Sequence, residues 1–137
     1  MSTDCLFCKI IAGEVPSRQV YVDEHAIAFL DIGPYHRGHT LVVPRRHVAD
    51  VLAEPPAWTE IAPAVEHTSK LLVERLGADG LNIFSSTGAV AGQDVFHLHV
   101  HLVPRYESLA GGRELYQRTA STDPAELDAV HAELVEG

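Results

Sequence analysis

The chain has 137 residues, a formal net charge of −9 and 46 % hydrophobic residues, which predicts one soluble domain with a substantial core rather than a disordered or multidomain protein. Ten Lys and Arg against nineteen Asp and Glu argue against broad binding to a nucleic-acid backbone, but they allow a local site for a small anionic ligand. Nine histidines are more than a chain of this size usually carries, and histidine titrates near neutrality, ligates metals and can act as a nucleophile.

The N-terminal segment carries a closely spaced cysteine pair and no sign of a targeting peptide. No basic region is followed by an apolar run, and no stretch approaches the ~18 apolar residues of a membrane span. A disulfide between Cys5 and Cys8 would close a very short loop and stabilise little. We therefore expect a reduced, cytoplasmic setting, in which such a pair is more often metal-binding or redox-active.

The first predicted elements are strands. Two β-prone segments, 19–22 and 26–30, are separated by a polar pair and predict a hairpin. The sequence at 31–34 then breaks the pattern. The β-branched run 40–43 ends at Pro44 and predicts a strand that is buried on both faces.

The hydrophobic period changes after residue 56 and predicts the main helix. Apolar side chains recur near one helical face at Trp58, Ile61, Val65, Leu72 and Leu76. The helix is expected to stop at Gly77. Pro63 should kink the helix or mark a later start.

The remaining segments return to strand patterns before a final helix. Residues 81–85 predict a strand, 88–92 form a glycine-rich loop, and 95–103 predict a long alternating strand. Asp123 as the N-cap and Pro124 at the first position predict a short helix with Leu127, Val130 and Leu134 on one side. Because the strands connect mostly through short turns, we expect an α+β fold with an antiparallel sheet of about five strands.

Three histidines alternate with aliphatic residues in the last predicted strand. His97, His99 and His101 would share one face at intervals of about 6.6 Å, with the aliphatic residues packed into the core behind them. The alternative is a half-buried strand whose polar face happens to be histidine. The loop just upstream contains small residues whose N–H groups could approach phosphate oxygens, and Gln93 adds a neutral amide.

The cysteine pair has the spacing of half a tetrahedral zinc site, although two unrelated thiols would show the same spacing. A redox pair fits less well, because the cysteines lack a βαβ context. His39 and His47 flank the strand at 40–43, so one could serve the histidine site and the other a metal. The other histidines, His25, His36, His67 and His131, are expected to be solvated at the surface.

These residues resemble the histidine triad (HIT) family, in particular the branch of small nucleotide hydrolases related to protein kinase C interacting protein. The resemblance covers the chain from Cys5 to about Arg105. It rests on four ordered motifs: CLFCKII at 5–11, FLDI at 29–32, GHTLVVPRRH at 38–47 and AGQDVFHLHVHLVP at 91–104. It implies a single histidine triad domain over residues 1–137, with a core at about 5–105 and a C-terminal extension at 106–137.

The resemblance implies that His99 attacks the α-phosphorus of a purine nucleotide and forms a covalent nucleotidyl-histidine, which water then hydrolyses. A neutral imidazole is a good nucleophile near pH 7, and dividing the displacement into two steps lowers each barrier. By the same resemblance His101 and Gln93 would contact phosphoryl oxygens, and His39 would support the nucleophile.

The resemblance also implies a nucleotide pocket and a structural zinc. The purine would lie among Phe7, Ile10, Phe29 and Ile32, with Asp31 on the ribose hydroxyls, Ser86 where relatives commonly carry asparagine, and Asp94 where a serine often holds phosphate. Zinc would be bound by Cys5, Cys8, His47 and His97. An alternative from the residues alone, in which the three histidines of the row bind one catalytic metal, would remove the nucleophile.

The sequence therefore predicts a nucleotide hydrolase that acts at the α-phosphate of purine nucleoside phosphoramidates or adenylylated compounds. The alternatives are a dinucleoside polyphosphate hydrolase or nucleotidyl transferase that uses His99, and a nucleotide-sensing or partner-binding protein with weak catalysis. By analogy with the family we expect a cytoplasmic homodimer formed by the main helix and a sheet edge. The segment after Arg105 does not match the tryptophan-bearing tail of the phosphoramidase relatives.

Overall fold

The computed structural model describes residues 4–107 and 115–136 and contains a five-stranded antiparallel sheet with strand order β1-β2-β3-β5-β4. The strands are β1 (Gln19–Val22), β2 (Ala26–Leu30), β3 (Thr40–Pro44), β4 (Gly80–Phe84) and β5 (Val100–Arg105), and the helices are α1 (Leu6–Ile11), α2 (Trp58–Leu76), α3 (Pro124–Glu136) and the short 3₁₀ turn η1 (Ala89–Ala91). The predicted α+β class and antiparallel sheet are confirmed.

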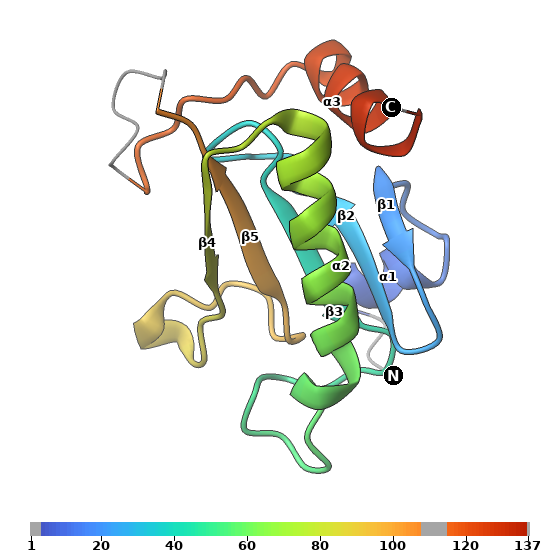
Figure 1. Ribbon diagram of the computed structural model, residues 1–137. Coiled ribbons are helices and arrows are strands. Elements are labelled where there is room, and N and C mark those ends of the chain that lie inside the picture. The colour runs from blue at the N-terminus through green and yellow to red at the C-terminus, as the bar shows by residue number, and fades with distance from the viewer. Residues whose placement is uncertain (1–3, 108–114, 137) are drawn as a thin grey trace.

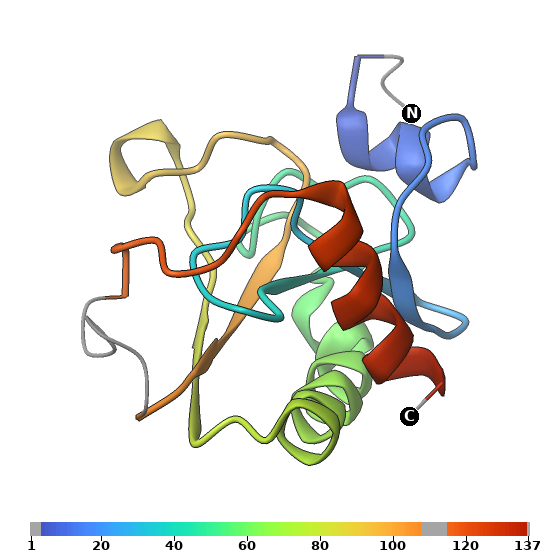
Figure 2. The ribbon, with the colours of Figure 1, turned by 90° about the horizontal axis from the view of Figure 1, so that it is seen from above.

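Helices cover both faces of the sheet. Figure 1 shows α2 across the front of the sheet and α1 behind it, and Figure 2 shows α3 beside α2. All residues of β2 and β3 are buried, as the apolar run 40–43 predicted for β3. Because successive side chains of a strand point to opposite faces, Ala28 and Val42 pack in the α2 cluster, whereas Phe29 and Leu41 pack with α1.

The end of α2 and the start of α3 follow their sequence signals. Helix α2 ends at Gly77, which adopts a left-handed conformation with φ 68° that glycine takes at little cost. Helix α3 begins at Pro124, and the Asp123 carboxylate accepts a hydrogen bond from Ala125 N at 3.0 Å. Among the described residues no helix has both the length and the apolar character required to cross a bilayer.

Three sequence expectations need correction. Helix α2 begins at Trp58 and includes Pro63, so the proline does not mark a later start. Strand β5 begins at Val100 instead of residue 95, because Leu98 N donates to Val48 O at 2.8 Å, beyond the end of β3, and leaves the regular ladder. Helix α1 was missed because it is one short helix whose N-cap is a cysteine thiol, which accepts from Cys8 N.

Candidate active site

A cavity of about 240 Å³ opens on the α1 face of the sheet. Seven of the nine predicted nucleotide-binding residues line it, namely Phe7, Ile10, Phe29, Asp31, Ile32, His99 and His101, whereas Ser86 and Gln93 do not. Phe7 and Phe29 are buried and meet edge to face at 5.6 Å, whereas Ile32 is 73 % exposed at the rim. The site therefore combines an apolar wall, one carboxylate and two imidazoles.

Sheet register explains why segments far apart in sequence meet at this cavity. His101 pairs with Leu41 of β3 and with Phe84 of β4, so its side chain lies on the same face as Leu41. Phe29 of β2 pairs with Leu41 and shares this face. Helix α1 packs on that face and adds Phe7 to the wall.

His99 is held as a specific tautomer. Its Nδ1 donates to the carbonyl oxygen of His97 at 2.9 Å, because a carbonyl only accepts. The neutral ring therefore has its lone pair on Nε2, which lies 3.8 Å from an Asp94 carboxylate oxygen. The Ser85 hydroxyl donates to the backbone carbonyl of His99 at 2.8 Å and holds the same segment. Of the two ring nitrogens, Nε2 makes no hydrogen bond to the described residues, and it lies at the cavity.

His39 and His101 form a second, coupled pair. Tyr35 N donates to Nδ1 of His39 at 3.1 Å, so the proton of the neutral ring lies on Nε2, which donates to Nδ1 of His101 at 3.0 Å. His101 then carries its own proton on Nε2, where a ligand can accept it. Burial lowers the pKa of His39 to about 4 and that of His101 to about 4, so both rings are neutral at pH 7.

Aromatic rings enclose this histidine pair. Tyr35 stacks on His39 with centroids 5.6 Å apart, and Phe84 stacks on His101 at 4.5 Å. Tyr116 meets both Tyr35 and Phe84 edge to face. The rings therefore restrict how the two imidazoles can turn, which preserves the bond between them.

The C-terminal segment holds the loop that contains Tyr35. Thr119 N donates to Tyr35 O at 2.7 Å, and the Arg118 guanidinium donates to Pro34 O at 3.0 Å. His36 is 1 % exposed, accepts from the Thr119 hydroxyl at 2.8 Å and donates to Leu115 O at 3.0 Å. The expectation that His36 is solvated was therefore wrong, because the loop and this segment bury it together.

The other three histidines that were expected at the surface lie away from the cavity. The side chain of His25 is 51 % exposed, and His67 is exposed and packs on Tyr21 at 4.6 Å. His131 is only partly buried and donates to Gln19 O at 2.7 Å. These contacts bind α2 and α3 to the sheet.

Gln93 and Ser86 occupy positions beside the glycine-rich loop rather than in the cavity lining. The Gln93 amide accepts from Gly88 N at 2.8 Å and donates to Ala49 O at 2.7 Å and Val95 O at 3.1 Å. Ser86 lies near Gly92, and neither residue belongs to the set that lines the described cavity. The Gln93 side chain therefore fixes the conformation of the loop at 88–92 and connects it to Ala49.

A second cluster contains two sulfurs and two nitrogens that could hold a metal ion, from Cys5, Cys8, His47 and His97. The two Nδ1 atoms are 3.2 Å apart, and the S···N distances are 3.3 to 3.5 Å. A tetrahedral zinc ion with Zn–N of about 2.0 Å and Zn–S of about 2.3 Å separates its ligands by about 3.3 to 3.8 Å. His97 Nε2 donates to Pro44 O at 2.8 Å, which leaves Nδ1 as the ligand atom.

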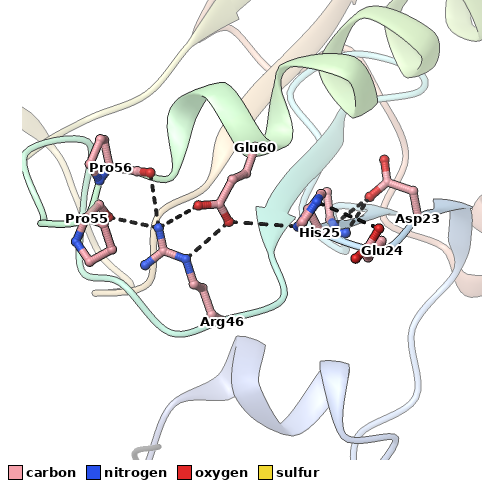
Figure 3. Close-up of polar contacts among 8 residues, drawn as sticks. Asp23, Glu24, His25, Arg46, Pro55, Pro56 and Glu60 are labelled. Atoms are coloured by element: carbon pink, nitrogen blue, oxygen red, sulfur yellow. Dashed lines mark hydrogen bonds and ion pairs between the residues drawn. The ribbon is translucent and has the colours of Figure 1, made fainter.

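The segment that carries His47 is fixed by its neighbour Arg46 (Figure 3). The Arg46 guanidinium makes two hydrogen bonds to Glu60 in the first turn of α2, at 2.9 and 3.2 Å. It also donates to the carbonyls of Pro55 and Pro56. These bonds connect the end of β3 to the start of α2 and so position one ligand of the Cys/His cluster.

Sequence reasoning missed Tyr35, Phe84, Ser85 and Tyr116 as contributors to the site. Tyr35 acts through its backbone N–H and its ring, Phe84 and Tyr116 through their rings, and Ser85 through its hydroxyl on a backbone carbonyl; none of these contacts has a residue-spacing signature in the sequence. Only the pairing of Phe84 with His101 in adjacent strands could have been anticipated, from the predicted strand at 81–85 and the histidine row.

An antiparallel sheet with helices on both faces and a buried histidine constellation beside an apolar pocket define the histidine triad class. The chain belongs to this family, since the family model described as HIT domain matches residues 12–108. The cysteine pair lies outside that match, so the possible metal cluster joins the domain to the segment before it.

Individual proteins are similar over most of the chain. An uncharacterized HIT-like protein of Methanocaldococcus jannaschii is 49 % identical over 104 residues, 75 % of this chain and 80 % of that protein. Adenylylsulfatase HINT3 of Arabidopsis thaliana is 37 % identical over 108 residues, 78 % of this chain and 55 % of its own length. A zinc-bound histidine triad family protein from Mycobacterium smegmatis has a TM-score of 0.80 and 35 % identity, over 99 % of this chain and 96 % of that one.

Proposed function

We propose that the protein is a nucleotide hydrolase that cleaves at the α-phosphate of purine nucleoside phosphoramidates or adenylylated compounds through a covalent nucleotidyl-His99 intermediate. The observation that carries this proposal is the tautomer of His99, whose Nδ1 is engaged with His97 O while Nε2 is directed to the cavity. A fixed lone pair beside a pocket is the requirement for nucleophilic catalysis. HIT family membership and the name of the adenylylsulfatase relative support the reaction class.

The surrounding groups have complementary roles in this proposal. The purine lies between Phe7 and Ile32, and the ribose hydroxyls donate to Asp31. His101 offers its Nε2 proton to a phosphoryl oxygen or to the leaving group, and His39 holds His101 in that tautomer. Gln93 acts by shaping the loop at 88–92, and Ser86 lies beside that loop.

We further propose that Cys5, Cys8, His47 and His97 hold a structural zinc ion. The interatomic distances and the bond from His97 to Pro44 support a tetrahedral site, and a zinc-bound relative has this fold. Zinc would connect α1 to the segment that precedes β5. Reduced cysteine ligands suit a cytoplasmic location.

A dinucleoside polyphosphate hydrolase or a nucleotidyl transferase would use the same His99 chemistry, and a nucleotide sensor would bind without turnover. The deciding experiment incubates the protein separately with adenosine 5′-phosphoramidate and with diadenosine polyphosphates. We expect release of AMP by the wild type and a loss of at least about a thousandfold in kcat/KM for His99→Ala, because removal of a nucleophile abolishes the covalent route.

The matched control is His25→Ala, which removes an exposed histidine away from the cavity and should leave the rate unchanged. Wild type quenched during turnover with denaturant at alkaline pH, where the P–N bond of a nucleotidyl-histidine is stable, should carry a nucleotidyl group on the peptide that contains His99, detectable by mass spectrometry. Unchanged turnover in His99→Ala would refute the nucleophile, and tight nucleotide binding without turnover in the wild type would favour the sensor.

A further inference from the structure

Asp94 places a carboxylate directly beside the reacting nitrogen. One of its oxygens lies 3.8 Å from His99 Nε2, and its side chain is 84 % exposed. Asp94 and His99 line the same cavity, and the charge of Asp94 also acts on His101. The carboxylate therefore lies beside the part of the cavity next to His99 Nε2, where the α-phosphorus and its leaving group would bind.

Other charges do not offset this carboxylate near His99. Of the described residues that line the cavity, Arg18 is the one lysine or arginine, and its guanidinium is bound to Asp128 at 2.7 Å. The second carboxylate, Asp31, accepts from Gly33 N at 2.8 Å. The field around Nε2 is therefore negative, in a chain whose formal net charge is −9.

The two candidate substrate classes develop opposite charges in the first step. The lone pair of His99 Nε2 forms a bond to the α-phosphorus while the bond to the leaving group breaks. In a phosphoramidate the leaving nitrogen takes up a proton from solvent, carries positive charge while the P–N bond breaks, and departs as a neutral amine. His101 is neutral, so its Nε2–H donates a hydrogen bond at this site and keeps its own proton. In a polyphosphate or an adenylyl sulfate the leaving oxygen departs with added negative charge.

A fixed carboxylate stabilises the first charge distribution and destabilises the second. We propose that Asp94 is the specificity-determining residue for the leaving group, favouring amine leaving groups and rejecting phosphate and sulfate ones. This inference rests on the proposed function of His99. It makes nucleoside 5′-phosphoramidates, above all those of cationic amines, the preferred substrate class.

The test compares kcat/KM of the wild type and Asp94→Asn for an alkylamine phosphoramidate of adenosine, adenosine 5′-phosphosulfate and diadenosine tetraphosphate. One charge pair separated by several ångströms at a solvated site changes a rate by roughly tenfold. We therefore expect Asp94→Asn to gain about tenfold on the two anionic leaving groups and to lose severalfold on the phosphoramidate. Added salt should reduce the ratio of kcat/KM for the phosphoramidate to kcat/KM for the anionic leaving groups in the wild type, and should leave this ratio unchanged in the variant.

The control is Glu136→Gln, which removes the same charge from an exposed position at the end of α3 and should leave the preference unchanged. If Asp94→Asn changes all three substrates by the same factor while turnover still requires His99, the selectivity role is overturned and the proposed function stands. If the wild type turns over none of them, both proposals fail.

Discussion

At the scale of single residues, the site depends on which nitrogen of each imidazole carries a proton. Backbone groups decide this for His39 and His99: Tyr35 N donates to Nδ1 of His39, and His97 O accepts from Nδ1 of His99. Backbone donors and acceptors do not titrate, so they hold one tautomer of each ring as long as that ring is neutral. The lone pair of His99 and the proton of His101 are consequences of these two bonds.

The low pKa values of His39 and His101 predict that the free energy of unfolding decreases as the pH is lowered. Burial places both folded-state values at about 4, below the ordinary 6.5, so unfolding takes up protons between these values. Their contribution is complete above about pH 6.5 and is lost as the pH falls toward 4. We expect the urea midpoint of the wild type, measured by circular dichroism, to decrease as the pH is lowered from 6.5 to 4.

His101→Asn should reduce this slope, because one titrating group is removed while the Cys/His cluster remains common to both proteins. His25→Asn, at a half-exposed position, should keep the wild-type slope. Equal slopes in the wild type and His101→Asn would show that burial of this imidazole does not couple to unfolding.

At the scale of elements, the short helix α1 lies outside the HIT domain match yet forms one wall of the cavity. A helix of this length has little stability of its own, so tertiary contacts must hold it. Phe7 and Ile10 supply apolar packing, and Cys5 and Cys8 supply two of the possible metal ligands. The proposed zinc would therefore hold the purine-binding wall in place.

This arrangement predicts that metal content depends on the cysteine pair. Zinc measured by plasma mass spectrometry should be about one ion per wild-type chain and should fall to background in Cys8→Ser, because a tetrahedral site loses one of its thiolates. A chelator should lower the thermal midpoint of the wild type by several degrees but not that of the variant.

His47→Ala should lose the metal in the same way, whereas His25→Ala should retain it, since His25 lies outside the cluster. Circular dichroism of both variants establishes that the sheet is intact. Full zinc content in Cys8→Ser would exclude the four-ligand site.

The C-terminal segment is a second element that supports the site from outside the family match. Tyr116, Arg118 and Thr119 contact the loop at 33–36, and that loop supplies the bond from Tyr35 N to His39. The support reaches His39 and His101 through the backbone N–H of Tyr35 and through the rings of Tyr35 and Phe84, which Tyr116 contacts.

At the scale of the whole molecule, β4 leaves one edge of the sheet without a neighbouring strand in the part of the chain that the structure describes (Figure 1). Beside it, a groove is lined by Trp58 and Val65 of α2 and by Ile83 of β4, and the side chains of Trp58 and Ile83 are partly exposed. An open strand edge with apolar neighbours favours pairing with a second copy. We therefore propose that the homodimer expected by analogy with the family forms at this edge.

The proposed dimer predicts that Ile83→Glu yields a monomer, because a charge would be buried where an apolar side chain was. Sedimentation should give twice the mass of one chain for the wild type and the mass of one chain for the variant. Val90→Glu is the matched control, since Val90 is fully exposed on the η1 turn and should leave the dimer intact. A monomeric wild type at micromolar concentration would refute the dimer.

The sequence by itself determined the sheet, the main helix and most of the residues that line the cavity. Alternating runs predicted strands because burial on one face imposes a period of two, and the apolar run at 40–43 predicted β3 because burial on both faces requires apolar residues throughout. Gly77 predicted the end of α2 because it accepts a left-handed backbone. The four motifs placed Phe7, Phe29 and His99 in one site.

The tertiary structure alone decided how these residues act. The tautomers of His39 and His99 follow from backbone groups of Tyr35 and His97, which have no signature in the sequence. The burial of His36 required a segment 79 to 83 residues away along the chain, and the irregular start of β5 required the bond from Leu98 to Val48. Local patterns report which face of an element is apolar, whereas these interactions arise only when distant segments meet.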